Sequence, residues 1–339
     1  MAVTLGAKAF TKVVAKSETA YGTASSFNDA LGELLHTDIV GVIDPGVSVD
    51  LADDKSAGIR PRRLASSATV TAKAPVITLA DAPVSARNLP IYFDALATIT
   101  PTGAGPYSWI YTPSATDVDT IKTYSLFLTD GVQKYIVDGC VPSELTLSAD
   151  QSGLLQAGVT WSARNIATTT DTSTAAFAQQ YFVPGRLFGV RTDSSWISTV
   201  GGGNAYSTYA TNWSLTLMPG AAPLQVLNGS TTNVNAGGVA YTGAFDGTLE
   251  ITIASNSTKA SAFPLADIGT KKFVQVSGID SSGYGFTASI VGVMENVSVI
   301  GSESDGLILE TVTLQLASDG TNTVKCWISS PLAVRPPSA

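Results

Sequence analysis

The side chains that most often catalyse reactions or bind metals are scarce in this sequence. His36, in the segment GELLHTDIVG, is the single histidine among 339 residues. A zinc site needs three or four Cys, His or carboxylate ligands, and a Ser-His-Asp arrangement needs a histidine beside the nucleophile. No second histidine and no cysteine cluster accompanies His36, so we interpret it as a packed or solvent-facing side chain. We expect no catalytic residue, no metal site and no cofactor, and we predict that the protein is not an enzyme.

Two groups of carboxylates and one run of glycines are candidates for ion or phosphate binding. Asp53-Asp54 and the pair Asp117 and Asp119 fall in polar segments. A calcium site needs six or more oxygen ligands at a characteristic spacing, which neither group supplies. The glycine run 201–203 lacks the following Lys-Ser/Thr of a phosphate-binding loop. We interpret the carboxylates as solvated turns and the glycines as a flexible loop.

One cluster of basic residues stands out from an acidic chain. Arg60, Arg62 and Arg63 lie in DDKSAGIRPRRLASS, whereas the whole chain has a net charge of −8 and a pI near 4.6. An acidic protein lacks the positive field that holds nucleic acids through their phosphates. Acidic residues on one side and arginines on the other suit a complementary surface on another subunit. We predict a subunit contact, with a plain exposed loop as the alternative. Nucleic-acid contact is the weakest interpretation, because no aromatic residues are interleaved.

Cysteine content and hydropathy bear on where the protein is made. Cys140 and Cys326 are the two cysteines, too few for a disulfide framework in a chain of this length. The N-terminal MAVTLGAKAFTKVVAK lacks the apolar centre of a secretory signal, and no run of about 18 apolar residues would span a bilayer. We expect reduced thiols, synthesis in a cytoplasm and no membrane partner.

Short alternating apolar runs recur about every ten residues and predict an all-β fold. They are bounded by Gly, Asp, Asn and Pro, which is typical of sandwiches and barrels. With 44% hydrophobic and 14% charged residues, the chain has the composition of a globular protein. The predicted strands cover residues 47–53, 68–80, 107–112, 123–129 and 134–139, then 186–192, 211–219, 246–254, 271–277, 285–293, 295–317 and 322–328.

One helix is predicted within this β pattern, and the chain length predicts two domains. In RNLPIYFDALATI, Asn88 is placed to cap the helix and Pro90 suits its first turn. A chain of 339 residues is long enough for two cores. The predicted organisation is an N-terminal arm (1–36), a first β domain (37–165), a linker (166–185), a second β domain (186–329) and a C-terminal tail (330–339).

One hairpin occurs twice in the sequence. SELTLSADQSGLLQAGVTWSAR (143–164) aligns with ENVSVIGSESDGLILETVTLQLAS (295–318) when one residue is inserted in the second turn. Similarity at a fixed offset over two strands indicates a duplicated structural unit. We therefore predict two similar β-sandwich domains. The alignment matches Leu145 with Val297 and Val159 with Val312.

Three stretches carry a family resemblance. They are AKSETAYGTASSF near the N-terminus, YSLFLTDGVQKYIVDGCVPSELTLSADQSGLLQAGVTWSAR, and TNWSLTL followed later by ASIVGVMENVSVIGSESDGLILETVTLQLASD. Their order resembles the tail tube (major tail) proteins of long-tailed, non-contractile bacteriophages. The resemblance implies a β-sandwich with a flanking helix, subunits joined in rings, and rings stacked into a tube. The chain departs from the family pattern in its long 181–210 connection and in a shortened second helix.

The resemblance also implies partners and a location. The protein would belong to the virion tail, with a tape-measure protein and tail-tip or terminator proteins as partners, and DNA would pass through the tube without tight binding. Most relatives use one tube domain per subunit and six subunits per ring, so a chain with two such domains is expected to close a ring with three copies. The N-terminal 36 residues show little apolar periodicity, and we expect them to lie on a neighbouring subunit or ring.

Strand alternation suggests which residues would line such a tube. On the repeated hairpins, the face opposite the apolar residues is polar, and two glutamates lie on the corresponding side of their strands. A wall of like charge keeps DNA mobile, whereas a lysine-lined wall would hold it. We expect an acidic or neutral lumen, with the candidates Glu144, Thr160, Ser162, Glu250, Thr313 and Gln315.

The competing interpretation is a surface-binding β-sandwich, a carbohydrate-binding or adhesin module of a virion or cell. Exposed tryptophans would stack on sugars in such a module. Alternation places Trp213 on the same side of its strand as Leu215 and Leu217, so we expect its ring to be buried. Burial of the aromatic residues would favour the tube.

Overall fold

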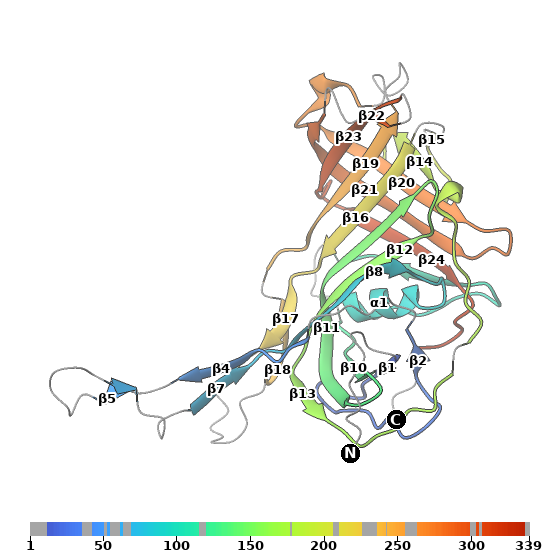
Figure 1. Cartoon of the computed structure of the whole chain (residues 1–339). Helices are drawn as coiled ribbons and strands as arrows, with labels where there is room; N and C mark the ends of the chain where they lie inside the picture. The colour runs from blue at the N-terminus through green and yellow to red at the C-terminus, as the bar shows by residue number, and fades with distance from the viewer. Residues whose placement is uncertain are drawn as a thin grey trace.

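The computed structural model describes most of the chain between Lys12 and Arg335. In the described part a single α-helix accompanies many antiparallel strands (Figure 1). The predicted all-β fold with a minor helix is confirmed. The described residues are 12–35, 43–50, 53–54, 62–63, 69–114, 120–176, 178–205, 210–225, 236–241, 243–254, 263–298, 303–304 and 307–335.

The first half of the chain forms what we call the first unit. A hairpin inserted after β3 contains β4 (Val47–Asp50) and β7 (Thr69–Lys73), with the short strands β5 (Asp53–Asp54) and β6 (Arg62–Arg63) between them. The other elements are β1 (Lys12–Ser17), β2 (Glu33–Leu34), β3 (Ile43–Asp44), β8 (Val76–Pro83), α1 (Leu89–Leu96), β9 (Tyr107–Tyr111), β10 (Tyr124–Thr129), β11 (Lys134–Asp150), β12 (Gln156–Ser162) and β13 (Asn165–Thr168).

The second half forms the second unit. It also contains an inserted hairpin, made of β17 (Ala221–Leu224) and β18 (Gly238–Tyr241), and two short 3-10 turns, η2 (Gly185–Leu187) and η3 (Leu265–Asp267). Its other strands are β14 (Gly189–Asp193), β15 (Asn204–Ala205), β16 (Ala210–Met218), β19 (Asp246–Ala254), β20 (Lys271–Ile279), β21 (Gly285–Val297), β22 (Glu303–Ser304), β23 (Leu307–Leu316) and β24 (Val324–Ser330).

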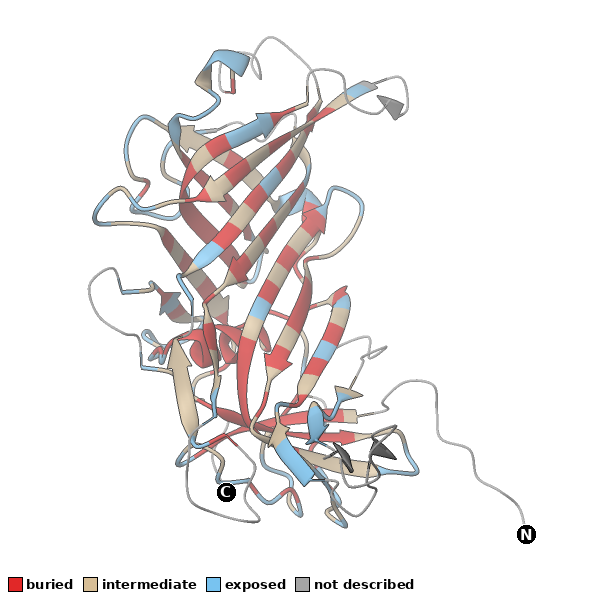
Figure 2. Ribbon diagram, turned by 90° about the vertical axis from the view of Figure 1, so that its left-hand side faces the viewer, coloured by how far each residue is buried: buried red, intermediate tan, exposed pale blue. Residues whose placement is uncertain are grey.

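Eight strands form one continuous antiparallel sheet that runs through both units. Their order is β3-β8-β12-β11-β16-β19-β23-β21. Buried and accessible residues alternate along these strands, as expected for a sheet with one face on a core (Figure 2). The pairing of β11 with β16 joins the units, and β9 of the first unit pairs with β24 of the second. Backbone hydrogen bonds therefore hold the two units together.

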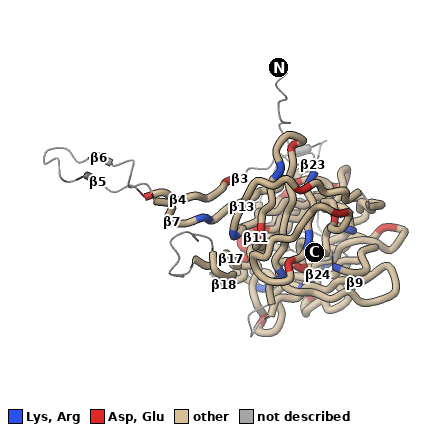
Figure 3. Tube along the Cα trace, turned by 90° about the horizontal axis from the view of Figure 1, so that it is seen from below, with Lys and Arg blue, Asp and Glu red and all other residues tan. Residues whose placement is uncertain are grey.

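Each unit repeats the same set of strand pairings. The order β8-β12-β11 in the first unit corresponds to β19-β23-β21 in the second. The hairpin β10–β11 corresponds to β20–β21, the outer strand β1 to β14, and β13 to β24. Each unit also inserts a two-stranded hairpin, β4–β7 or β17–β18, at the same place in this order, and β4–β7 projects from the body of the molecule (Figure 3).

The repeated hairpin has the same irregularity in both units. β11 skips Ser143 where it pairs with β12, and β21 skips Glu295 where it pairs with β23. On both sides of these positions the pairings follow the alignment of the two sequences. A bulge of this kind inserts one extra residue and bends the strand. Its recurrence at aligned positions means that the two units share structural detail beyond a common apolar pattern.

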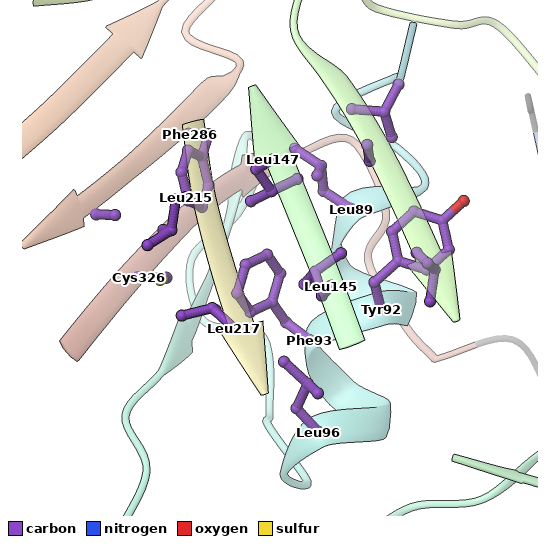
Figure 4. Packing of buried hydrophobic residues seen from close by; sticks show 14 of the residues in the cluster. Leu89, Tyr92, Phe93, Leu96, Leu145, Leu147, Leu215, Leu217, Phe286 and Cys326 are labelled. Atoms are coloured by element: carbon purple, nitrogen blue, oxygen red, sulfur yellow. The ribbon is translucent and has the colours of Figure 1, made fainter. Parts of the chain in front are cut away.

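One large hydrophobic core serves both units. All residues of α1 are buried, and they join the apolar faces of strands from both units in a single cluster. Figure 4 shows α1 beside Leu145 of β11 and Leu215 of β16. The rings of Phe93 in α1 and Phe286 in β21 lie 5.8 Å apart between centroids. The chain length suggested two cores, but the core is shared, because one helix packs beneath strands of both units.

The helix begins where the sequence predicts, with a different role for its first polar residue. α1 begins at Leu89, and Pro90 lies in its first turn. Asn88 occupies the N-cap position but forms no capping hydrogen bond. Its side-chain amide instead donates to the Leu34 carbonyl oxygen at 3.3 Å. Asn88 therefore links the start of the helix to β2.

The N-terminal segment is part of the fold of its own chain. β1 pairs with both β10 and β2, and residues 13–15 are fully buried. Lys16, also fully buried, reaches Asp29 at 2.8 Å and lies 5.2 Å from the centre of the Phe27 ring. The expectation that the segment lies on a neighbouring subunit is wrong for residues 12–35. Strand pairing and the ion pair of a buried lysine with a partly exposed aspartate hold it, which apolar periodicity does not reveal.

The segment predicted to be a linker, 166–185, is packed against the chain. β13 pairs with β11 through Asn165–Thr168. Asp171 accepts hydrogen bonds from the Phe27 backbone N–H at 2.7 Å and from the Asn28 amide at 2.8 Å. The segment therefore connects the units along a fixed path.

The C-terminal tail ties the second unit to the helix of the first. Trp109 Nε1 donates to the Leu332 carbonyl oxygen at 2.9 Å. Two guanidinium N–H groups of Arg335 donate to the two carboxylate oxygens of Asp94. This carboxylate is 1% exposed and also accepts a hydrogen bond from the Tyr124 hydroxyl at 2.7 Å. Burial raises the pKa of the Tyr124 phenol well above its ordinary value, so this group stays neutral and donates.

Replacing Arg335 with methionine is expected to lower the free energy of unfolding by about 2 to 3 kcal/mol. The reason is that the buried Asp94 carboxylate would lose its cationic partner. Urea unfolding followed by tryptophan fluorescence measures the change. The double variant Asp94→Asn with Arg335→Met should recover part of the loss, because no unpaired charge then remains buried. Equal stability of wild type and Arg335→Met would contradict a stabilising role for this tail.

Candidate functional site

The face of the eight-stranded sheet that points away from the core is the first candidate surface, and we call it the polar face. Along its strands, apolar residues turn to the core and polar residues turn outward, since successive side chains of a strand point to opposite sides. On this face Thr160 pairs with Glu144 and Thr313 with Glu250. All six lumen candidates lie here, and each is half-buried or exposed: Glu144, Thr160, Ser162, Glu250, Thr313 and Gln315.

The charge on the polar face has one sign. No lysine or arginine occurs in β8, β12, β16, β19 or β23, or in the part of β11 from 141 to 150. The same strands carry several exposed carboxylates. The polar face therefore combines hydroxyl and amide groups with acidic residues and has no cation on these strands. The exposed carboxylates belong to Asp81, Glu144, Asp150, Asp246 and Glu250.

Small hydroxyl side chains line the junction between the two units on this face. Thr146 of β11 faces Thr216 of β16, with the two hydroxyl oxygens 3.4 Å apart. The next pair along the junction is Ser148 with Ser214. Cross-strand pairs of this type contribute roughly 0.2–1 kcal/mol each to sheet stability. The junction is thus held by backbone pairing with modest help from side chains.

The second candidate surface is the hairpin β4–β7, which we call the first arm. It projects from the body of the molecule (Figures 1 and 3). Every residue of β4 is exposed, including Val47 (44%) and Val49 (51%), and Val70 of β7 is 38% exposed. Apolar residues gathered on a projecting ribbon are typical of an interaction surface. The first arm is therefore available to a partner.

Two of the three predicted interface arginines lie on this arm. The backbone of Arg63 pairs with that of Asp53, and Arg62 pairs with Asp54. Arg60 lies outside the described residues. The segment that the sequence suggested to be a loop, with Asp53-Asp54 in a solvated turn, thus includes a short β-ladder. This ladder brings residue types of opposite charge to facing strand positions.

The equivalent hairpin of the second unit, β17–β18, is the second arm, and it packs on the first unit. β17 contacts β11, and Arg164 Nε donates to the Ala236 carbonyl oxygen at 3.2 Å. Residues 239–241 of β18, together with 18–21 and 121–123 of the first unit, line an open cavity of about 560 Å³. The two arms therefore differ: the second packs on the first unit, whereas the first projects from the body and is joined at its base, where Gln225 Nε2 donates to the Lys73 carbonyl oxygen at 2.7 Å.

A buried carboxylate organises the surface beneath the second arm. Glu18 is 1% exposed and accepts hydrogen bonds from the Gly139 N–H, the Thr123 hydroxyl and the Ser125 hydroxyl at 2.7–2.8 Å. The Tyr21 hydroxyl has no hydrogen-bond partner among the described residues, and burial raises the pKa of this phenol above its ordinary value. Since Glu18 joins β1, β10 and β11, it fixes the floor of the cavity.

Groups that could carry out chemistry are not assembled in the described part of the chain. Within it, no three His, Cys, Asp or Glu side chains are placed to share a metal ion, and no helix is long and apolar enough to cross a bilayer. His36, Asp117 and Asp119 lie outside the described residues. Gly201, in the glycine run, donates its backbone N–H to Gln275 Oε1 at 2.8 Å. The loop that was predicted to be flexible is therefore anchored at this residue.

Comparison with protein-family models and with curated proteins finds no match for this chain. The fold, the polar face and the arms are therefore the structural features from which a function can be inferred. It also depends on the sequence resemblance, which remains an expectation.

The arms are the feature that sequence patterns did not reveal, although one signal was present. Gly46 and Gly220 precede the two arms and both adopt positive φ, 57° and 71°. A Cβ at Gly46 would lie 2.0 Å from the Ala74 carbonyl oxygen, and one at Gly220 would lie 2.4 Å from the Gly243 carbonyl oxygen. Glycine is required where each arm leaves the sheet. The repeated glycine was the available clue.

The polar face can be tested by a pair of lysine substitutions. Thr313→Lys is expected to change the free energy of unfolding by less than about 1 kcal/mol, because the side chain points outward beside Glu250. Val312→Lys, one residue away, places a charge in the core and should prevent stable folding. Urea unfolding of the two variants is the measurement, and comparable losses in both would contradict the assignment of the two faces.

Proposed function

We propose that this protein is a structural subunit of a phage tail tube, polymerising as stacked rings into the conduit for DNA ejection. The observation that carries the proposal is the eight-stranded sheet, built from two equivalent four-stranded units joined edge to edge. Such a sheet has a first strand and a last strand that are equivalent to strands already paired inside the chain. A repeated edge contact between different surfaces generates a ring or a filament.

The polar face supports a lumen-lining role for the sheet. Duplex DNA carries about one negative charge per 1.7 Å of axis, and lysine contacts would release counterions and hold it. Strands with carboxylates and hydroxyls but no lysine or arginine leave DNA free to move. Screening over roughly 8 Å at physiological salt makes the residues that face the bore decisive. Those residues would include Glu144, Glu250 and their hydroxyl neighbours.

Two units in one chain support a ring of three copies, with six units around the lumen. The arms supply further contacts, and the Arg62–Arg63 segment at the end of the first arm would then meet a neighbouring subunit in the same or the next ring. On this proposal the protein is located in the virion tail. Its partners are copies of itself, with a tape-measure protein and tail-tip or terminator proteins implied by the resemblance.

The alternative of a carbohydrate-binding or adhesin module has less support. Trp109, Trp161 and Trp213 are 0–3% exposed, so their rings face the core. Trp327 is half-buried, and the Lys325 ammonium lies 4.8 Å from its ring centre. A sugar-binding platform needs an accessible aromatic face, which Trp109, Trp161 and Trp213 do not offer. The other two tryptophans, Trp196 and Trp327, are half-buried.

Electron microscopy of the purified protein tests the proposal. We expect rings or hollow filaments, with class averages showing six similar lobes of two alternating kinds. Two kinds of lobe are expected because the two units differ in the length of their helical segments and because the second arm is docked whereas the first projects. Discrete globules at all protein and salt concentrations tried would contradict the tube, and lobes of a single kind would contradict the ring of three.

Lysines placed at equivalent lumen positions should make assembled tubes bind DNA. The variant with Thr160→Lys and Thr313→Lys adds six cations to a ring of three. Because each neutralised phosphate releases counterions, co-sedimentation of linear duplex DNA with tubes should rise at low salt and fall steeply between about 50 and 200 mM salt. Wild-type tubes should leave DNA in the supernatant. The same binding by a control variant with Val132→Lys, on an exposed turn, would contradict lumen placement.

A further inference from the structure

We propose that one copy of this chain binds the next by repeating the contact that joins its own two units. The contact pairs β21 of one copy with β3 of the next, in the register in which β11 pairs with β16, and it docks the first arm on the second unit of the neighbour. The inference deepens the proposed function and rests on it for the assembled state. The partner is a second copy of this chain.

The contact inside the chain provides the template. β11 and β16 pair from Leu145 opposite Leu217 to Asp150 opposite Asn212. Thr146 and Thr216 lie opposite each other on the polar face, with hydroxyl oxygens 3.4 Å apart. Register in a sheet is fixed by which side chains face the core, because a shift of one residue exchanges the two faces.

The equivalent of Thr146 is set by the repeated bulge. Ser143 and Glu295 are the bulge residues of the two hairpins, and three residues beyond them lie Thr146 and Ser298. Ser298 also continues the pairing of its strand, since its backbone N–H donates to the Thr311 carbonyl oxygen at 3.0 Å. Ser298 therefore occupies in the second unit the place of Thr146 in the first.

The equivalent of Thr216 is set by register on the other edge. Asp44 and Thr160 both have pairing partners on β8. The partner of Asp44 lies two residues before the partner of Thr160. Thr216 and Thr313 both have pairing partners on β19. Here too, the partner of Thr216 lies two residues before the partner of Thr313. Thr160 and Thr313 are matched by the repeated hairpin, so Asp44 is the equivalent of Thr216.

Both edges are open in the described part of a single copy. β3 pairs with β8 on one side, and no described strand pairs with its other side. Val297 and Ser298 face β23 on one side, and no described strand lies on the other. These edges are the first and the last of the eight-stranded sheet, so one copy does not join them to each other. Open strand edges readily accept a further strand.

The surfaces beneath the two arms give a second, matching observation. Tyr124 pairs with Cys140 and Lys272 with Gly292, at matched positions, so residues 269–271 correspond to residues 121–123. Residues 121–123 lie beneath the second arm, whereas residues 269–271 are all exposed.

Apolar side chains are exposed both on the first arm and on the surface of the second unit around residues 269–271. Ile268 and Leu265, next to residues 269–271, are 43% and 56% exposed. The first arm carries Val47, Val49 and Val70, which are also exposed. The arm that would cover this surface is thus the free one, and a neighbouring copy supplies it.

Disulfide trapping tests the predicted register. The double variant Asp44→Cys with Ser298→Cys should form covalent dimers, trimers and higher species under mild oxidation, seen on a non-reducing gel. A mixture of the two single variants should form dimers only, because each copy then has one reactive edge. Native Cys140 and Cys326 are fully buried, and burial raises the pKa of both thiols, so they remain unreactive.

Two control pairs make the result specific. Thr146→Cys with Thr216→Cys, the equivalent pair inside the chain, should close within each copy and give only monomers of increased mobility. Ile43→Cys with Ser298→Cys, shifted by one residue on β3 and so facing the opposite side of the sheet, should give little intermolecular product. Monomers alone from the Asp44 and Ser298 pair, while the Thr146 and Thr216 pair closes, would overturn the proposed junction.

The arm contact has its own variant. Val49→Asp should reduce the rate and extent of assembly, measured by light scattering, at least tenfold. Val132→Asp, which is similarly exposed on a turn away from both edges, should leave assembly unchanged. Equal assembly of the two variants would remove the arm from the proposal.

The trapping result and the microscopy result separate the two proposals. Cross-linked dimers and short open chains that never close into rings or extend into filaments would support the junction and contradict the tube. Hollow filaments formed by a variant whose Asp44 and Ser298 cysteines do not cross-link would support the tube and contradict the junction.

Discussion

The antiparallel pairing of β11 with β16 is the interaction on which the rest of the structure depends. It converts two four-stranded units into one sheet, and it aligns their apolar faces over a common core. β11 can do this because it is 17 residues long and bends: its first part pairs with β10 and β13, and its last part with β12 and β16. Without that pairing, each unit would expose an apolar sheet face of its own.

One core serves both units although, in the described part of the chain, only the first unit contains an α-helix. α1 packs in the first unit, and its Phe93 ring reaches Phe286 in the second, whose ring in turn stacks on Trp213. These aromatic rings thus connect the helix of the first unit to β16 and β21 of the second. The C-terminal tail, through Arg335 and Asp94, then fastens the second unit to the same helix. One helix and one ion pair thus serve two units.

Periodicity in the sequence predicted the strands well because each alternating run has one face on the core. The repeated hairpin was aligned correctly to the residue, since Leu145 and Val297 occupy equal positions around equal bulges. What periodicity did not predict depends on contacts between distant residues. Lys16 is buried because Asp29 and Phe27 meet it, and the arms leave the sheet because Gly46 and Gly220 allow a turn. Alternation indicates which face of a strand is polar, but not what that face meets.

Duplication within one chain has a consequence for assembly that a single unit would lack. In a ring of identical single units every junction is the same, so any sequence that favours closure also favours premature association of free subunits. In the proposed assembly half of the junctions are intramolecular, and they form on folding with hydroxyl pairs such as Thr146 and Thr216. The other half are intermolecular, and each of them depends on β3, an edge strand that is only two residues long and includes the charged residue Asp44. A short edge strand with a charge is a weak template for pairing, so the intermolecular junction depends on the arm as well as on the strand, and the free arm becomes the element that decides when copies join.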